Sequence, residues 1–425
     1  MEEEGLRQRR KEPDSDSIGP LLGEGNELKY KQPQKGSCFR CLFRLLLWLI
    51  VFDLVIILAL TAVYFLVKGP IDAQSYRLPS PPPLSGPLAV NDMLTRTERI
   101  MVGELSGPES IYIAPEGKFY TGTWDGLVLE MAQRKITRQV RMGKAPPCAT
   151  FETEPTCGRP LGIRQTRDNK FVVADAYLGL FLVDIYAGTK QQLVAGGMEI
   201  DGRPLRFLND LDILEDGTIL FTDSSSTWDR RRFPFILLEG KGDGRLLSYN
   251  PETNDVQVLL DGLHFANGVQ LSIDQKYVLV SETTRARVIK YHLTGRKRGQ
   301  SEIFVENLPG FPDNIRLSSN GSYWIPLAGL RHKDQFSLVD FIADKPWIRN
   351  LITKIFPANL ILKGFARFKL PHSVVVLVDT NGRYVSSLHD PTGKVVPDVS
   401  QVTDVGKVLF LGSYHANFMG KLVLD

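Results

Sequence analysis

The sequence is poor in cysteine and carries nearly balanced charge, and both features exclude classes of protein. Its 51 basic and 48 acidic residues leave a formal net charge of only +3. So small an excess over 425 residues predicts neither a nucleic-acid-binding surface nor an acidic tail. The four cysteines have no accompanying histidines at zinc-site spacing. The sequence also lacks a Gly-x-Ser-x-Gly nucleophile elbow and a nucleotide-binding glycine loop, so neither a serine hydrolase of that kind nor a nucleotide-binding protein is indicated.

Long apolar runs are scarce too, with a single one at residues 45–67 that only Asp53 interrupts. Such a run is long enough to cross a hydrocarbon core of ~30 Å. The central acid costs ~2.5–3.5 kcal/mol, which this many Leu, Ile and Val residues offset. A cleaved signal peptide fits poorly, because the run starts late and is too long. We predict a transmembrane helix at 45–67, preceded by a polar, disordered tail at 1–44.

Basic residues crowd the N-terminal side of this run: Lys29, Lys31, Lys35, Arg40 and Arg44. The positive-inside rule therefore places the N-terminus in the cytosol and everything after about Lys68 outside the cell or in a lumen. This is the arrangement of a single-pass type II membrane protein. A proline-rich stretch at 68–86 predicts a stiff spacer between the membrane and the remaining chain.

The cysteines divide into two pairs. Cys38 and Cys41 adjoin the apolar run, where S-palmitoylation and plain free thiols are both open. Cys148 and Cys157 fall in the part predicted to lie on the oxidising side and flank a proline-containing loop, so we predict a disulfide between them. A bridge over so short a loop stabilises by about 2–3 kcal/mol. The only N-glycosylation sequon is Asn-Gly-Ser at Asn320, and Asn-Gly is typical of an exposed hairpin tip.

From about residue 87 to residue 425 the sequence repeats a unit of roughly 50 residues, a period typical of a propeller. Each unit has a first position, an alternating strand, a turn and a second strand that ends in small polar residues. The first positions are Glu109, Leu161, Asn209, Asn267, Asp313 and Ser400. Paired strands at this period predict an all-β, six-bladed β-propeller over 87–425. The long last interval contains helical apolar spacing at 336–356, which predicts a helical insertion before the last blade, either a lid over one face or a helix on a blade edge.

The repeated first position carries mostly oxygen ligands. Four of the six residues are carboxylates or carboxamides: Glu109, Asn209, Asn267 and Asp313. Because the first strand of each propeller blade lines the central channel, these side chains should meet on one axis. Ca²⁺ takes 6–8 oxygens of these kinds, whereas zinc prefers His and Cys and Mg²⁺ usually keeps several waters. We predict a Ca²⁺ site, with Asn314 or Asp210 as a further ligand; the alternative is a set of hydrogen-bonded caps at strand starts.

Several of these segments resemble a known family. Residues 207–211, 265–269 and 312–315 resemble the inner-strand motifs of strictosidine synthase-like propellers, and residues 157–163 resemble their second-blade motif. The resemblance covers nearly all of 87–425. That family is related to the paraoxonases, which are calcium-dependent six-bladed lactonases and arylesterases. The resemblance implies five Ca²⁺ ligands: Glu109, Asn209, Asn267, Asp313 and Asn314.

The resemblance implies weak, metal-assisted hydrolysis of a small ester or lactone. Leu161 stands where paraoxonases carry a His that is proposed as general base, and Ser400 stands where strictosidine synthase carries its Glu. Strictosidine synthase activity is therefore not expected. Asp313 and Asp210 are the candidate catalytic residues within the ligand shell. Candidate bases from elsewhere are His264, His372 and His415.

A second interpretation is open. The intact ligand set also suits a catalytically reduced propeller, in which the ion is structural and the surface binds a partner. Such a protein acts in cell-surface binding, adhesion or scaffolding. The resemblance further places the protein at the plasma membrane, with the endoplasmic reticulum as an additional location.

Overall fold

The computed structural model describes residues 36–424, beginning with helix α1 (Gly36–Leu66). Residues 39–66 form the one helix in this range that is long and apolar enough to cross a membrane. It starts earlier than the predicted span of 45–67, because Phe39, Leu42 and Phe43 extend its apolar surface past the basic residues. The predicted disordered tail lies outside the described residues up to residue 35, and its last part, 36–44, is helical instead.

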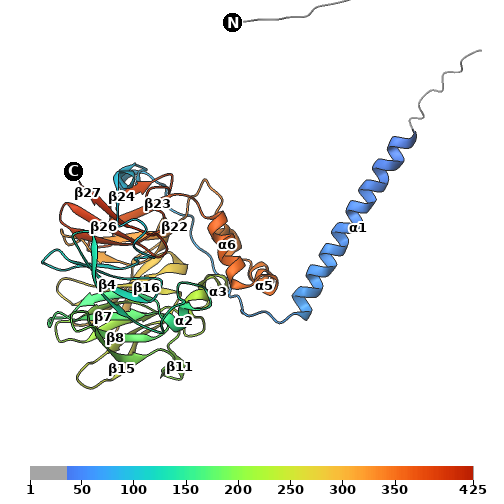
Figure 1. The fold of residues 1–425 in the computed structure, drawn as a ribbon. Helices are drawn as coiled ribbons and strands as arrows, with labels where there is room; N and C mark the ends of the chain where they lie inside the picture. The colour runs from blue at the N-terminus through green and yellow to red at the C-terminus, as the bar shows by residue number, and fades with distance from the viewer. Residues whose placement is uncertain (1–35, 425) are drawn as a thin grey trace, which may run out of the picture. The chain divides into compact units, whose positions relative to one another are not determined.

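The rest of the chain is a six-bladed β-propeller (Figure 1), which confirms the predicted fold. The first two blades are β2 (Ile111–Ile113), β3 (Phe119–Gly122), β4 (Leu127–Ala132) and β5 (Lys135–Arg141), then β6 (Pro160–Gln165), β7 (Phe171–Asp175), β8 (Gly179–Asp184) and β9 (Thr189–Ala195). The next two are β12 (Leu208–Ile213), β13 (Ile219–Asp223), β14 (Gly244–Tyr249) and β15 (Val256–Leu263), then β16 (Ala266–Leu271), β17 (Tyr277–Glu282), β18 (Arg287–His292) and β19 (Ser301–Val305). A small ribbon of β10 (Glu199–Ile200) and β11 (Arg203–Pro204) lies between the second and third blades in the chain.

The fifth and sixth blades are less regular. The fifth contains β20 (Gly310–Pro312), β21 (Arg316–Leu317), β22 (Tyr323–Leu330), β23 (Ser373–Val378) and β24 (Tyr384–Asp390). The sixth contains β25 (Val399–Val405), β26 (Val408–Ser413), β27 (Met419–Val423) and, as its outermost strand, β1 (Glu98–Ile100). Strand β1 pairs antiparallel with β27, so that Glu98 lies opposite Lys421. The ring is therefore closed by strands from the two ends of the propeller.

The hydrophobic core lies between neighbouring blades. Strands β7, β13 and β23 are buried at every position, because each packs against a blade on both faces. One cluster, for example, joins Ala174 of the second blade to Phe221 of the third. This packing explains why these inner strands are so rich in apolar residues.

The helical insertion lies inside the fifth blade, between β22 and β23. It consists of α4 (Leu338–Ala343), α5 (Pro346–Ile355) and α6 (Ala358–Phe368), so it is longer than the predicted 336–356. Ser337 caps α4 by accepting a hydrogen bond from the Asp340 amide, and Pro346 starts α5. The helices pack on α3 (Phe233–Glu239) at one face of the propeller (Figure 1), rather than on a blade edge alone.

The segment predicted as a spacer is partly a packed strap. Ile71, Ala73 and Tyr76 are buried, and the first two join a cluster of α3, α4 and α6 side chains. The Gln74 amide donates to the Glu239 carbonyl oxygen at 2.7 Å. Ile71 and Ala73 alternate with the polar residues Asp72 and Gln74, a strand-like pattern that the nearby prolines obscured. The segment is extended, as expected, but residues 71–76 are bound to the propeller rather than holding it away.

Candidate functional site

The five predicted Ca²⁺ ligands gather at one end of the innermost strands. Glu109 lies two residues before β2, Asn209 belongs to β12, and Asn267 belongs to β16. Asp313 and Asn314 lie between β20 and β21. Their exposed fractions are only 2–5%. We call these five residues the oxygen cluster. Burial of two acids and three amides requires partners for their polar atoms.

The backbone is irregular where these side chains leave it. The pairing registers of β12 and β16 shift at Asn209 and Asn267, and those of β6 and β25 shift at Leu161 and Ser400. A β-bulge redirects the side chain that it carries. In the fifth blade, Asp313 occupies the gap between two short strands instead. At five of the six repeated positions the strand pairing is therefore shifted or interrupted.

A glycine allows the fourth and fifth blades to approach closely. A Cβ atom on Gly268 would lie 2.4 Å from the amide nitrogen of Ile315 and 2.5 Å from Cα of Asn314. Only glycine fits such contact. The approach brings the Asn267 side chain within hydrogen-bonding reach of the Asp313 carboxylate.

Two hydroxyl groups fix the orientation of the amides. The Ser224 hydroxyl donates to the Ala266 carbonyl oxygen at 2.6 Å, and the Thr283 hydroxyl donates to the Pro312 carbonyl oxygen at 2.8 Å. A hydroxyl has one proton, so the amide atom beside each must itself be a donor. The amide nitrogens of Asn209 and Asn267 accordingly donate to Ser224 and Thr283 at 3.1 and 3.2 Å. The Oδ1 atoms are left on the opposite sides of these amides.

The amide oxygens of the cluster lack partners. Oδ1 atoms of Asn209, Asn267 and Asn314 are all buried, and no group among residues 36–424 hydrogen-bonds to them. A buried polar atom without a partner costs about 1–3 kcal/mol. Three such oxygens beside two carboxylates are the donor set that a hard cation such as Ca²⁺ takes. The residues present therefore fit the predicted ion. In the described chain no three His, Cys, Asp or Glu residues are grouped to hold a metal, since amides supply most of this set.

The electrostatics of the cluster also suit a cation. Burial, and next the negative charge of Glu109, raise the pKa of Asp313 well above its usual range. Glu109 has one cationic partner already, because Nη2 of the fully buried Arg159 lies 3.3 Å from its Oε2. Arg159 also donates to the Tyr414 carbonyl oxygen at 2.9 Å. Burial lowers the pKa of Arg159 to about 10, which leaves it charged at neutral pH.

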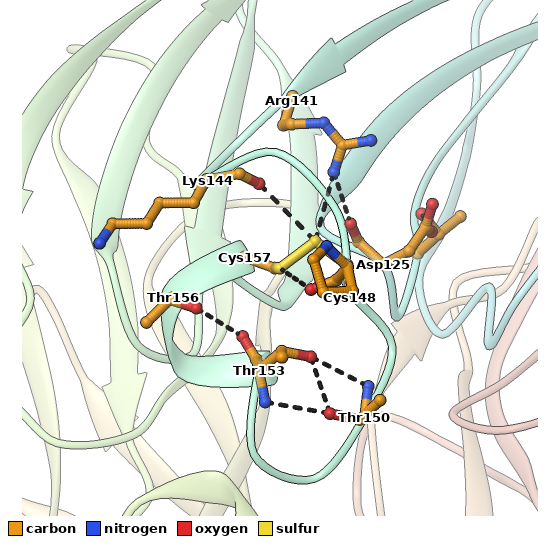
Figure 2. The surroundings of a disulfide bond; sticks show 10 residues. Asp125, Arg141, Lys144, Cys148, Thr150, Thr153, Thr156 and Cys157 are labelled. Atoms are coloured by element: carbon orange, nitrogen blue, oxygen red, sulfur yellow. Dashed lines mark hydrogen bonds between the residues drawn. A yellow bond between two sulfur atoms is a disulfide. The ribbon is translucent and has the colours of Figure 1, made fainter.

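The predicted disulfide is present and anchors the chain that leads to Arg159. Cys148 and Cys157 are bonded at 2.02 Å (Figure 2), and Cys157 ends the short helix α2 (Glu154–Cys157) two residues before the arginine. The same helix carries Glu154, which accepts hydrogen bonds from Arg230 at 2.9 and 3.1 Å. The loop is therefore fixed both covalently and by a buried ion pair.

The second candidate base, Asp210, is occupied elsewhere. Its two oxygens accept from Arg316 at 2.6 and 2.9 Å, and Oδ2 also accepts from the Val269 amide at 2.8 Å. Both carboxylate oxygens are therefore already engaged as acceptors, by a buried guanidinium and a backbone amide. Asp210 therefore holds neighbouring blades together, and Asp313 is the remaining catalytic candidate of the two.

Leu161 and Ser400 have structural roles. Leu161 is buried in an apolar cluster with Phe207, Ile236 and Phe265, so α3 covers the position next to the channel. The Ser400 hydroxyl donates to the Glu109 carbonyl oxygen at 2.9 Å and joins the last blade to the first.

Of the three histidines considered, His415 has the surroundings of a base near the cluster. It lies one residue after Tyr414, and its Nε2 is 3.2 Å from Oδ2 of Asp398. Lys369 also pairs with Asp398, and its positive charge acts on Asp313. The repeat pattern does not identify Lys369 and Asp398, because both residues lie in connections outside the repeat.

The other two candidate histidines have hydrogen-bond partners outside the oxygen cluster. Nδ1 of His264 lies 3.0 Å from the Gly240 carbonyl oxygen, and Nε2 of His372 lies 2.9 Å from Nδ1 of His389. The predicted glycosylation site, Asn320, is exposed at the β21–β22 turn, as expected for a hairpin tip, and its modification stays a prediction. Among the described side chains Cys41 is a free, exposed thiol, while that of Cys38 lies outside them, and S-palmitoylation also stays a prediction.

Comparisons with known proteins agree with this architecture. The strictosidine synthase family model matches residues 209–296, and the strictosidine synthase-like N-terminal model matches residues 86–131. Adipocyte plasma membrane-associated proteins of Gallus gallus and Homo sapiens are 42% and 39% identical over all of this chain and 99% of their own length. A strictosidine synthase-like protein of Arabidopsis thaliana is 35% identical over 80% of this chain and 91% of its own.

Solved structures show the same fold. A gluconolactonase from Xanthomonas campestris has a TM-score of 0.51 at 15% identity and covers 84% of this chain and 97% of its own. A luciferin-regenerating enzyme has a TM-score of 0.50 at 14% identity and covers 77% of this chain and 95% of its own. At such low identity these likenesses concern the fold alone.

Proposed function

The chain belongs to the adipocyte plasma membrane-associated protein family of strictosidine synthase-like propellers, and from this premise we propose that it is a membrane-anchored, Ca²⁺-binding hydrolase of small esters or lactones. The observation that carries the proposal is the set of three unpartnered, buried amide oxygens beside Glu109 and Asp313. The substrate class follows the resemblance to paraoxonases. The relatives are named for the plasma membrane, and α1 is a suitable single-pass anchor.

We further propose the type II orientation, with the propeller outside the cytosol. Its support is the basic sequence before α1, together with the disulfide between Cys148 and Cys157. Disulfides persist in oxidising compartments and are rare in the cytosol. Both observations favour the same side of the membrane for the propeller.

Glu109, Asn209, Asn267, Asp313 and Asn314 would hold the ion. Bound Ca²⁺ supplies a Lewis acid that polarises the ester carbonyl and stabilises the developing oxyanion. Burial, then the charges of Lys369 and Arg159, lower the pKa of His415, so its imidazole is neutral at pH 7. If Nε2–H donates to Asp398, Nδ1 is the basic nitrogen and accepts a proton from the attacking water.

The apolar surroundings of Leu161 favour a second candidate function. Leu161, packed among apolar side chains, occupies the position of the paraoxonase histidine, so no general base stands there. In this alternative the ion therefore has a structural role. The propeller then serves as a binding, adhesion or scaffold surface for an unidentified protein partner. Both functions require the ion, and they differ in whether an ester is cleaved.

The test uses the full chain in lipid nanodiscs, with Ca²⁺ titration, thermal melting in chelator, and turnover of phenyl acetate and δ-valerolactone. We expect chelator to lower the melting temperature and Asn267→Ala to weaken both Ca²⁺ binding and turnover. His415→Gln should lower kcat while Ca²⁺ binding is unchanged, and His372→Gln is the matched control. An unchanged melt without bound Ca²⁺ refutes the ion site. Ca²⁺ binding with equal background rates in all variants refutes the hydrolase and supports the structural alternative.

A further inference from the structure

The helical insertion has a second apolar surface. The inner sides of α4 and α6 are already buried, through Ile342 and Ile361 among others. Yet large apolar side chains also cover the outer side, which we call the outer face: Phe341, Trp347, Phe356, Leu360 and Phe368, exposed by 47–60%. Monomeric soluble proteins rarely expose apolar groups in such concentration, and exposed patches of this kind mark interaction sites.

The charge of the same segment has one sign. Residues 346–368 contain Arg349, Lys354, Lys363 and Arg367 and no acidic residue. Lys363 and Arg367 are exposed one and two turns after Leu360, so the outer face of α6 mixes apolar and cationic groups. Helices that lie in a membrane interface combine Lys and Arg with Trp, Phe and Leu in this manner. Anionic headgroups attract such cations by ~1 kcal/mol for each side chain.

The length of chain after α1 keeps this face near the membrane. Helix α1 ends at Leu66, and Ile71 is already buried among α3, α4 and α6. Five residue steps span at most ~18 Å even when fully extended. Pro70 lines a groove of about 570 Å³ together with Phe356 at the turn between α5 and α6. The outer face therefore cannot lie far from the point where the chain leaves the apolar helix.

We propose that the outer face of α5 and α6 docks on the surface of the bilayer that α1 spans, with the phosphate groups of the lipid headgroups as its partner. Trp347 and Phe356 insert at the headgroup level, and Lys363 and Arg367 contact phosphates. Lys369 directly follows α6, so docking turns the oxygen-cluster end of the propeller toward the membrane. Asn320 lies at the opposite end of the strands, where a glycan does not interfere. The docking does not depend on hydrolase activity.

The test uses the full chain in nanodiscs, with Cys38→Ser and Cys41→Ser so that a single introduced cysteine carries an environment-sensitive fluorophore. The probe sites are Trp347→Cys and Phe356→Cys. Val405→Cys is the control, since Val405 is 51% exposed at the β25–β26 turn, at the end away from the oxygen cluster. All three positions are exposed, so labelling leaves the fold intact; melting temperatures verify this.

We expect spin-labelled lipid to quench the probes on the outer face at least threefold more than the control in discs containing phosphatidylserine. Lys363→Glu with Arg367→Glu should reduce this quenching at least twofold in those discs. Quenching equal to the control overturns the proposal. Shielding from aqueous iodide without quenching by lipid overturns it as well, because a protein, such as a second copy of this chain, then covers the face.

Discussion

The hydroxyl of Thr283 offers the sharpest test of the oxygen cluster. It donates to the Pro312 carbonyl oxygen at 2.8 Å and accepts from the Asn267 amide at 3.2 Å, and it thereby leaves Oδ1 of Asn267 buried without a partner. Thr283→Val keeps the volume and removes both bonds. Two buried polar groups lose their partner, so we expect the free energy of unfolding without Ca²⁺ to fall by about 2–3 kcal/mol.

The larger effect concerns the ion. Outer groups that orient metal ligands typically contribute 10–100-fold to affinity, and a 30-fold rise in Kd corresponds to about 2 kcal/mol. At a free Ca²⁺ concentration of 100 times the wild-type Kd, the ion stabilises the wild type by about 2.7 kcal/mol. The same concentration stabilises Thr283→Val by only about 0.9 kcal/mol. Calorimetric Ca²⁺ titration and melting with and without the ion measure the two quantities.

The neighbouring residue supplies a matched control. Thr284 is 1% exposed, and its hydroxyl has no hydrogen-bond partner among the described residues. Thr284→Val should therefore leave stability and Ca²⁺ affinity unchanged or slightly improve stability. If Thr283→Val loses stability but keeps its Ca²⁺ affinity within twofold of the wild type, Asn267 is not held as a ligand and the reasoning fails.

Three further predictions concern the scaffold. Replacing Cys148 and Cys157 by Ser should lower the free energy of unfolding by about 2–3 kcal/mol in chemical denaturation, and an unchanged midpoint contradicts this. Burial raises the pKa of Asp175 to about 6, so its contribution to stability is present below about pH 4 and is lost as pH rises through 6. The unfolding free energy of Asp175→Asn, relative to that of the wild type, should therefore be up to about 3 kcal/mol higher at pH 7.5 than at pH 4. Parallel pH profiles of stability for the two proteins would refute this prediction. Asp210→Asn leaves the buried Arg316 without its counter-charge and should cost about 3–5 kcal/mol in unfolding free energy; a loss below 1 kcal/mol argues against the ion pair.

The repeat made the fold and most of the oxygen cluster predictable. A propeller places equivalent residues of each blade at equivalent positions, so one alignment of six short segments located Asn209, Asn267 and Asp313 together. The supporting hydroxyls were missed for a physical reason. Ser224 and Thr283 follow second strands, where small polar residues resemble ordinary turns, and each one bonds across to the next blade. Such contacts depend on the packing between blades, which the pattern of a single repeat does not contain.

Residues outside the repeat were harder to place. Lys369 and Asp398 stand in connections of unequal length, and no period relates them to Asp313. Asp210 looked like a free acid because its partner, Arg316, is 106 residues away in the sequence. The burial of Ile71 likewise depends on α3 and α6, which the sequence places far downstream. The local sequence pattern thus does not predict which charged residues pair over long distances or which residues the tertiary packing buries.

The pairing that closes the sixth blade determines when the propeller can finish folding during synthesis. Strand β1 leaves the ribosome first, and its partner β27 leaves last, with Glu98 opposite Lys421. Domains generally fold as units during synthesis, but this ring stays open until translation is nearly complete. Until then the earlier blades have exposed strand edges, which invite pairing with other chains. A premature stop that removes only β27 would release a protein with five complete blades and an open ring, in which β1 has no partner strand.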